Sequence, residues 1–111
     1  MIETLRALAE PNRLQIVELL HDGPRPVGEI AYRLRLHQPQ VSKHLRVLSD
    51  AGLVQVQQDA QRRVYGLRPE PFKELDVWVE SYRHFWDESL DRLDNYLTKL
   101  QKEEKKRGSK K

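Results

Sequence analysis

Two short amphipathic segments with a tight connection between them, within residues 27–53, restrict the possible folds of this chain more than any other part of its sequence. In the second segment, Val41, Leu45 and Leu48 are four and three residues apart, which places them on one side of a helix. At about 100° per residue, small and basic residues occupy the opposite side, where no core would hold them. These are Pro39, Ser42, Lys43 and Arg46. The pattern predicts a helix-turn-helix whose second helix has an outer face suited to phosphate oxygens and to base edges in a DNA major groove.

The size and composition of the chain argue against an enzyme. A chain of 111 residues can form one modest core but not two lobes around a deep catalytic cleft. It contains no cysteine, which excludes disulfides, thiolate nucleophiles and Cys-ligated metal sites. No glycine-rich phosphate loop and no cluster of histidines with acids occurs. We therefore expect a function at the surface, with no catalytic residues and no cofactor.

The sequence carries no signal for a membrane or for export. No basic and apolar leader pattern and no stretch of about 18 apolar residues is found. We therefore expect a soluble, cytoplasmic protein with no membrane partner.

Charge is divided unevenly along the chain. Residues 1–68 contain 10 bases and 7 acids, residues 69–98 contain 3 bases and 8 acids, and residues 99–111 contain 7 bases and 2 acids. Most of the basic excess of the first segment lies in residues 25–68, around the helix-turn-helix. The surface predicted to contact DNA is therefore basic, and the acidic segment at residues 69–98 should face away from a polyanion.

Two helices are expected before the helix-turn-helix. Leu5, Leu8 and Ala9 predict a short first helix that ends before Pro11, because proline fits the first turn of the next helix. In residues 11–21 apolar side chains surround most of the helix, which indicates a central buried helix. The third helix should carry its apolar stripe from residue 27 to residue 34, and the fourth should begin at Gln38-Pro39.

A hairpin should follow the fourth helix. Gly52 fits a helix end, and residues 53–57 alternate as a half-buried strand does. Residues 58–61 are polar, and residues 63–67 resume an extended pattern. A helix-turn-helix followed at once by a hairpin with arginines near its tip is the winged variety, whose tip can contact the DNA backbone. The fold class is therefore mainly α with a small β-hairpin, with five helices and a two-stranded wing.

The last predicted helix runs from about Phe72 to beyond Leu100 and has a strict spacing of four and three residues between its apolar positions. About 29 residues extend roughly 43 Å, well beyond the ~13 Å radius of gyration of a chain near this size. One copy cannot cover this helix, so a homodimer is expected. On this helix the expected interface contains Leu75, Val79, Tyr82, Trp86 and Leu93, and only Ser89 interrupts the apolar run.

The domain organisation follows from these elements. Residues 1–103 are expected to form one winged helix-turn-helix domain, with the dimerisation helix at about residues 72–103. Residues 104–111 are almost entirely charged or small and are expected to form a disordered basic tail.

Taken together, these segments resemble the ArsR/SmtB family of small dimeric winged-helix repressors over residues 2 to about 100. The resemblance rests on LRALAEPNRLQIVELL, on QPQVSKHLRVLSDAGLV and on the wing that ends in RRVYGL. It implies dimerisation through the first and last helices, which adds Leu5 and Leu8 to the expected interface. It also implies binding of a homodimer to an inverted-repeat operator in double-stranded DNA, and repression. The matching DNA-contacting positions are Gln38, Gln40, Ser42, Lys43 and Arg46, with Arg62 and Arg63 in the wing.

The family's metal-sensing residues have no counterpart in this sequence. Many relatives carry a cysteine pair in the recognition region, or a set of aspartate, histidine and glutamate ligands on the last helix. Counting the usual spacing from Asp76 reaches Trp78, Ser89 and Arg92, which do not form a ligand set. We expect no metal, and the sequence does not identify an effector.

Several features allow other interpretations. His37 stands where relatives often have a serine or threonine cap, and His44 could either pack inside the domain or bind a phosphate. Trp78, Tyr82, Phe85 and Trp86 could line a pocket for an apolar inducer rather than a dimer core. The long helix could also bind a different chain, which would make the protein a winged-helix interaction module.

Overall fold

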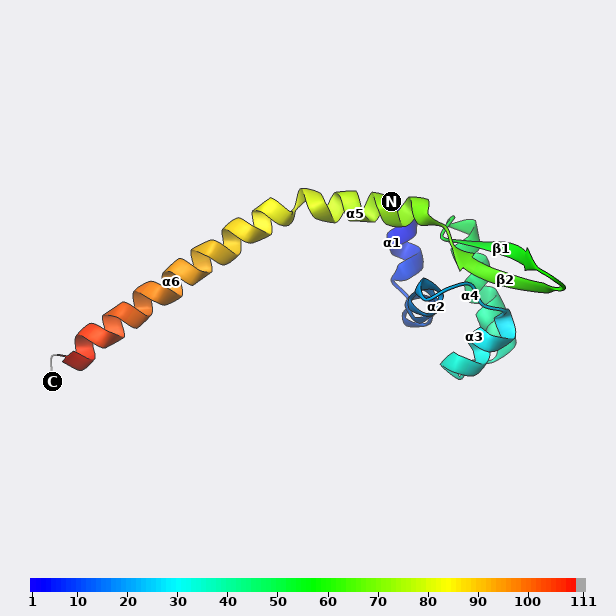
Figure 1. Cartoon of the computed structure of the whole chain (residues 1–111), viewed down its shortest axis with the longest axis horizontal. Helices are drawn as coiled ribbons and strands as arrows, with labels where there is room; N and C mark the ends of the chain where they lie inside the picture. The colour runs from blue at the N-terminus through cyan, green and yellow to red at the C-terminus, as the bar shows by residue number, and fades with distance from the viewer. Residues whose placement is uncertain (110–111) are drawn as a thin grey trace. The chain divides into compact units, whose positions relative to one another are not determined.

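The computed structural model describes residues 1–109, and their backbone forms helices and one hairpin (Figure 1). The elements are α1 (Ile2–Leu8), α2 (Pro11–His21), α3 (Val27–Leu34), α4 (Gln38–Asp50), β1 (Val54–Asp59), β2 (Arg62–Leu67), α5 (Pro69–Ser81) and α6 (Arg83–Ser109). The chain divides into a unit at Met1–Leu75 and a second unit from Asp76 onward. The predicted winged helix-turn-helix, mainly α with a two-stranded wing, is confirmed.

Helix α2 is the central helix of the first unit, as its sequence predicts. It contacts α1, α3, α4 and β2. The core around it contains seven fully buried side chains: Ile16, Ile30, Val41, Leu45, Leu48, Leu53 and Val54. Burial of these apolar groups is the main force that holds the helix-turn-helix together.

The ends of α4 follow the local signals in the sequence. Pro39 lies in its first turn, where a missing N–H costs nothing. At the other end Gly52 has φ +79°, a left-handed conformation that favours glycine. The Leu53 N–H then donates to the Leu48 carbonyl at 2.9 Å, which closes the helix.

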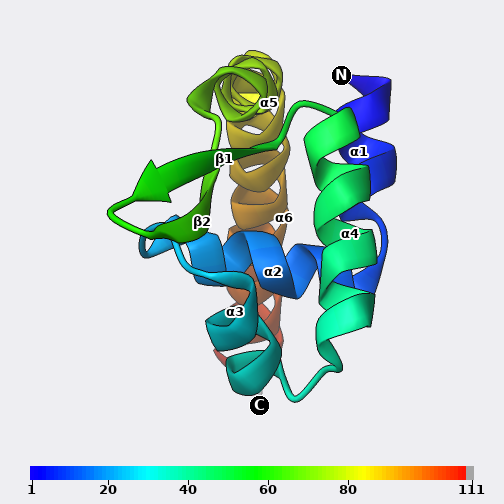
Figure 2. The ribbon, with the colours of Figure 1, turned by 90° about the vertical axis from the view of Figure 1, so that its right-hand side faces the viewer.

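The two strands of the wing pair antiparallel, from Val54 opposite Leu67 to Asp59 opposite Arg62 (Figure 2). The strands therefore extend further than the sequence pattern predicts, and the tip contains only Ala60 and Gln61. Arg62 belongs to strand β2 rather than to the tip.

The second unit corrects the prediction of one continuous last helix. The chain is interrupted at Tyr82, between α5 and α6. The Ser81 hydroxyl donates to the Trp78 carbonyl at 2.6 Å, and the Tyr82 N–H donates to the Val79 carbonyl at 3.0 Å. A serine hydroxyl thus occupies the carbonyl that the Tyr82 N–H would use in a regular α-helix. Such back-bonding by serine bends helices.

Helix α6 also continues further than expected, to Ser109. Residues 104–109 are therefore helical where the sequence predicts a disordered tail, and residues 110–111 lie outside the described residues. Glutamate, lysine and arginine have high helix propensity, and extending an existing helix avoids the cost of nucleation. No helix in the described range is long and apolar enough to cross a membrane.

Candidate nucleic-acid interface

Helix α4 is anchored by one apolar side and leaves the other side open. Val41, Leu45 and Leu48 are buried against the core, as predicted. Each of the five positions predicted to contact DNA on this helix is exposed. These are Gln38, Gln40, Ser42, Lys43 and Arg46. The result is a face of amide, hydroxyl and cationic groups presented by a rigid helix.

The first turn of α4 is held by one of these polar residues. The Gln40 side-chain oxygen accepts a hydrogen bond from the His37 backbone N–H at 3.2 Å. This contact is the glutamine half of a capping box. Gln40 therefore supports the start of the helix with its oxygen, while its NH₂ group is available to an acceptor on a ligand.

His44 faces into the domain rather than outward. Its side chain is only 20% exposed, and its Nδ1 lies 3.7 Å from Oε2 of Glu10. Of the two interpretations that the sequence allows, the structure supports packing. The contact joins the recognition helix α4 to the residue that caps α2.

Glu10 and Arg13 together connect three helices through polar contacts. Its Oε2 accepts a hydrogen bond from the Arg13 backbone N–H at 2.8 Å, which caps α2. The Arg13 side chain in turn donates from Nε to the Ala7 carbonyl at the end of α1, at 2.6 Å. The hydrogen bond from the Arg13 backbone, with smaller contributions from Asn12, His44 and the Arg13 charge, lowers the pKa of the Glu10 carboxyl below its ordinary value of 4.5.

We expect Glu10→Gln to lower the stability of the fold at neutral pH, with little effect in acid. A lowered pKa in the folded state means that the ionised carboxylate stabilises the fold above the unfolded pKa. This contribution is lost as the pH falls through the folded pKa. Urea unfolding of the wild type and the variant at pH 7 and at about pH 3 measures the difference, which should shrink at the lower pH. Glu18→Gln, on the exposed side of α2, is the matched control. An equal loss of stability at both pH values would contradict this expectation.

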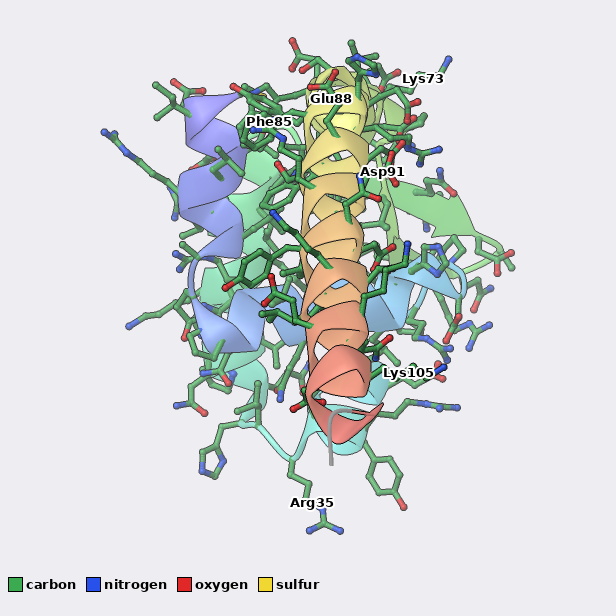
Figure 3. All side chains as sticks on the ribbon, turned by 90° about the vertical axis from the view of Figure 1, so that its left-hand side faces the viewer. Arg35, Lys73, Phe85, Glu88, Asp91 and Lys105 are labelled. Atoms are coloured by element: carbon green, nitrogen blue, oxygen red, sulfur yellow. The ribbon has the colours of Figure 1, made fainter. Side chains whose placement is uncertain are left out.

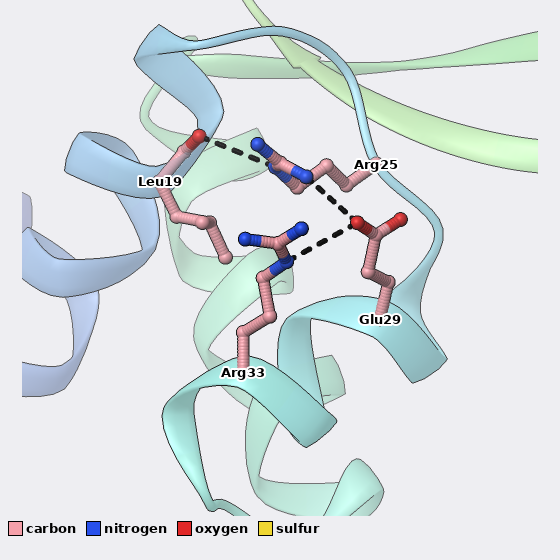
Figure 4. A network of polar contacts seen from close by, with 4 residues as sticks. All are labelled: Leu19, Arg25, Glu29 and Arg33. Carbon is pink, nitrogen blue, oxygen red and sulfur yellow. Dashed lines mark hydrogen bonds and ion pairs between the residues drawn. The ribbon is translucent and has the colours of Figure 1, made fainter.

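An arginine that the sequence alone did not single out, Arg25, joins the loop before α3 to the wing. Figure 4 shows the contacts of its side chain with the Leu19 carbonyl and with Glu29. Arg25 Nη1 lies 2.7 Å from Oε1 of Glu29, and Arg33 Nε lies 3.3 Å from the same oxygen. The Arg25 backbone also pairs with Tyr65 of β2, through hydrogen bonds of 3.0 and 2.9 Å. Arg25 therefore connects the loop before α3 to the wing. The available signal was a glutamate four residues after an arginine, a spacing typical of a local ion pair.

The wing presents the two predicted arginines, Arg62 and Arg63, to solvent. Arg62 Nη2 lies 3.9 Å from Oδ2 of Asp59, and both side chains are largely exposed, so this pair is weak. Within the part of the chain that the structure describes, Lys43, Arg46 and Arg63 make no ion pair. Cations of this kind can neutralise phosphates without first breaking a pair.

The seven residues predicted for dimerisation belong to both units. Leu5 is exposed on α1, whereas Leu8 and Leu75 are half-buried, and Leu8 packs against the core. In the second unit, Val79, Tyr82, Trp86 and Leu93 are exposed. A row of large apolar side chains open to solvent is typical of a protein interface.

Aromatic side chains gather around the helix break. Trp78 packs edge-on against Tyr82, with ring centroids 5.4 Å apart, and Phe85 packs edge-on against Trp86 at 5.8 Å. Together with Val79 they line an apolar hollow of about 490 Å³. Within residues 1–109, the hollow included, no group of three or more His, Cys, Asp or Glu side chains is placed to hold a metal ion.

Known proteins share both the sequence and the fold of this chain. A family model for a helix-turn-helix domain matches residues 8–57. The HTH-type transcriptional regulator Rv2034 of Mycobacterium tuberculosis is 41% identical over 85 residues, which cover 77% of each chain. The HTH-type transcriptional regulator NmtR of the same organism is 44% identical over 64 residues, which cover 58% of this chain and 53% of NmtR.

Solved structures extend the likeness to the fold. The homodimeric winged helix-turn-helix DNA-binding domain of Mb0332 from Mycobacterium bovis is 31% identical, with a TM-score of 0.61, and the match covers 72% of this chain and 74% of that chain. HlyU from Vibrio cholerae is 35% identical with a TM-score of 0.60, over 73% of this chain and 89% of that chain.

The winged helix-turn-helix and its open basic face define a class of transcriptional regulator, not an enzyme. Within this class, the chain belongs to the ArsR/SmtB family.

Proposed function

We propose that this protein is a homodimer that binds an inverted-repeat operator in double-stranded DNA and represses transcription by occluding a promoter. The observation that carries the proposal is the outer face of α4, where exposed polar and cationic side chains lie opposite a buried apolar anchor. A helix of this kind fits the major groove, and a two-fold dimer would present two of them to half-sites roughly 34 Å apart.

Each group of residues has a role in this proposal. Gln38, Gln40, Ser42, Lys43 and Arg46 contact base edges and phosphates in the major groove. Arg62 and Arg63 contact the backbone beside it. The exposed apolar residues of α1, α5 and α6 join the two copies.

Selection of bound sequences from random DNA is the experiment that tests the proposal. The expected result is an enriched inverted repeat with half-sites about one helical turn apart, together with a mass near twice 13.2 kDa. No enriched motif would contradict the proposal. A protein that ignores DNA and is stable only with a different chain would favour an interaction module instead.

Arg46→Ala is expected to weaken specific binding by roughly 1 to 3 kcal/mol and to relax the sequence preference at one position of each half-site. Arg46 is exposed on the outer face of α4 and makes no ion pair within residues 1–109, so its replacement should leave the fold intact. A gel-shift titration with the selected operator measures the change. Arg92→Ala, on α6, removes the same charge from a residue that is not among the predicted DNA contacts and serves as the control. Unchanged affinity and preference for Arg46→Ala would remove this residue from the contact surface.

The double variant Arg62→Ala/Arg63→Ala is expected to weaken binding to all DNA sequences alike. Each lost phosphate contact lowers the slope of log K against log salt by roughly 0.9, so a dimer that loses four contacts loses roughly 3.6. Affinities measured at several salt concentrations give this slope. A changed sequence preference with an unchanged slope would show that the wing reads bases rather than phosphates.

A further inference from the structure

Arg35, in the turn between α3 and α4, has a backbone conformation that L-residues rarely adopt. Its φ is 55° and its ψ is 42°, which is the left-handed region. Within residues 1–109, the other non-glycine residue with a positive φ is Ala60, at the tip of the wing. A Cβ crowds the backbone in this region, so glycine is the residue that usually occupies it. The turn therefore holds an arginine where its backbone favours glycine.

The end of α4 has the same turn with glycine in the left-handed position. At the end of α3, the Leu36 N–H donates to the Ala31 carbonyl at 3.0 Å. This hydrogen bond spans as many residues as the one that closes α4 after Gly52, and both turns are Schellman motifs. Glycine would therefore close α3 equally well. Position 35 differs from position 52 in what its side chain can do, and not in the path of the backbone.

The Arg35 side chain makes no polar contact that would explain its place in the fold. It is exposed, and Figure 3 shows it projecting away from the ribbon. Two nearby arginines, Arg25 and Arg33, both lie within ion-pairing distance of Glu29. Within the described part of the chain, Arg35 makes no ion pair and no side-chain hydrogen bond. Its guanidinium group can therefore bind a ligand without first losing a partner.

The position of this turn follows from the way a helix-turn-helix binds DNA. The second helix lies in the major groove with its N-terminal residues toward the bases, while the first helix crosses the DNA backbone. The turn that joins the two helices then lies at the edge of the groove, where the phosphates are. Arg35 is three residues before Gln38, the first residue of α4. A guanidinium group at this edge can bind a phosphate through two parallel hydrogen bonds.

We propose that Arg35 binds a phosphate of the DNA backbone at the edge of the major groove, in addition to the predicted contacts on α4 and in the wing. This inference rests on the DNA binding proposed above and adds a contact from the turn between the two helices. Glycine at position 35 would give a more stable fold, whereas arginine gives a higher affinity for DNA. Because every sequence has the same phosphates, the contact strengthens binding to all duplex DNA.

Arg35→Gly is expected to weaken DNA binding and to stabilise the fold. Loss of one phosphate contact from each copy of the proposed dimer should lower the slope of log K against log salt by roughly 1.8. The loss of affinity relative to the wild type should therefore be roughly 12-fold greater at about 50 mM salt than at about 200 mM. The midpoint of urea unfolding should shift to a higher concentration, because glycine relieves the left-handed backbone. A residue that only supports the fold cannot produce these opposite changes.

Arg35→Lys is the matched control for this experiment. It keeps both the positive charge and the crowded Cβ, so the salt slope and the urea midpoint should stay at their wild-type values. Arg92→Ala controls for the change in net charge and should leave the salt slope unchanged. If Arg35→Lys lost as much of the slope as Arg35→Gly, charge would not be what position 35 contributes, and the proposal would be overturned.

Gel-shift titrations with the selected operator and with an unrelated duplex of the same length separate this inference from the proposed function. The expected result for Arg35→Gly is the same reduction in slope on both duplexes. A wild-type slope for Arg35→Gly, beside an Arg46→Ala protein that loses affinity for the operator, would overturn the role of Arg35 alone. A wild-type protein that binds neither duplex would overturn the proposed function together with this inference. A lower urea midpoint for Arg35→Gly would show that the arginine supports the fold, and would also overturn the proposal.

Discussion

Replacing Leu45 with alanine is expected to lower the free energy of unfolding by about 2 to 5 kcal/mol, a large fraction of the stability of a small domain. Leu45 lies on the recognition helix, but its side chain is only 1% exposed and belongs to the core. The substitution removes apolar burial and leaves a cavity beside α2. Urea unfolding monitored by circular dichroism gives the change directly.

The neighbouring position supplies the control for this experiment. Arg46→Ala, one residue further along α4, should change the free energy of unfolding by no more than about 0.5 kcal/mol, because its side chain is exposed. The two variants should therefore separate stability from DNA recognition within a single helical turn. A Leu45→Ala protein as stable as the wild type, or an Arg46→Ala protein that unfolds early, would mean that α4 does not bury Leu45 and expose Arg46.

Trp86→Asp is expected to yield monomers and to reduce the apparent affinity for an inverted-repeat operator by roughly 100- to 10,000-fold. A carboxylate at position 86, in the row of exposed apolar side chains that includes Val79, Tyr82 and Leu93, would have to be buried without a partner in the dimer. An unpaired buried charge strongly disfavours association. Once the α4 helices of the two copies are no longer linked, the added affinity from binding two half-sites at once is lost. Analytical ultracentrifugation and a gel-shift titration at fixed salt measure the two effects.

Asn95→Asp introduces the same charge on the back of α6 and should leave both the mass and the affinity unchanged. Because Trp86 lies outside the core of the first unit, the Trp86→Asp protein should keep the circular dichroism of the wild type. A monomeric Trp86→Asp protein with full operator affinity would separate dimerisation from DNA binding and contradict the role of paired half-sites.

The helices of the DNA-binding half could be predicted almost to the residue. The bounds of α2, α3 and α4 agree with the sequence pattern because proline, glycine and apolar spacing act locally at each end. The strands of the wing were predicted as well, although they extend further toward the tip. Pairing with the opposite strand, and not the local sequence, determines where a strand ends.

The break at Tyr82 was missed because apolar spacing continues through it without a change of phase. The deciding contact is a single hydroxyl, Ser81 Oγ, bonded to the Trp78 carbonyl. A serine inside an otherwise regular helix was the only signal, and in most helices such a serine points to solvent or bonds without breaking the helix.

In the candidate site too, some features could be predicted from the sequence and others could not. The outer face of α4 could be predicted because one helix carries all of its residues. Contacts between distant elements could not, and they include the approach of His44 to Glu10 and the pairing of Arg25 with Tyr65. Charge counting placed Arg25 in a basic region but gave no indication of what it holds.

The attachment of the wing to the loop before α3 has an evolutionary consequence. The two hydrogen bonds between Arg25 and Tyr65 are made by backbone atoms, so nearly any residue except proline can form them at either position. The outward-facing side chains of the strands can therefore be substituted while the hairpin stays attached at the same point. Substitutions in a hairpin held in this way can therefore change its contacts with a ligand without changing where it is attached to the fold.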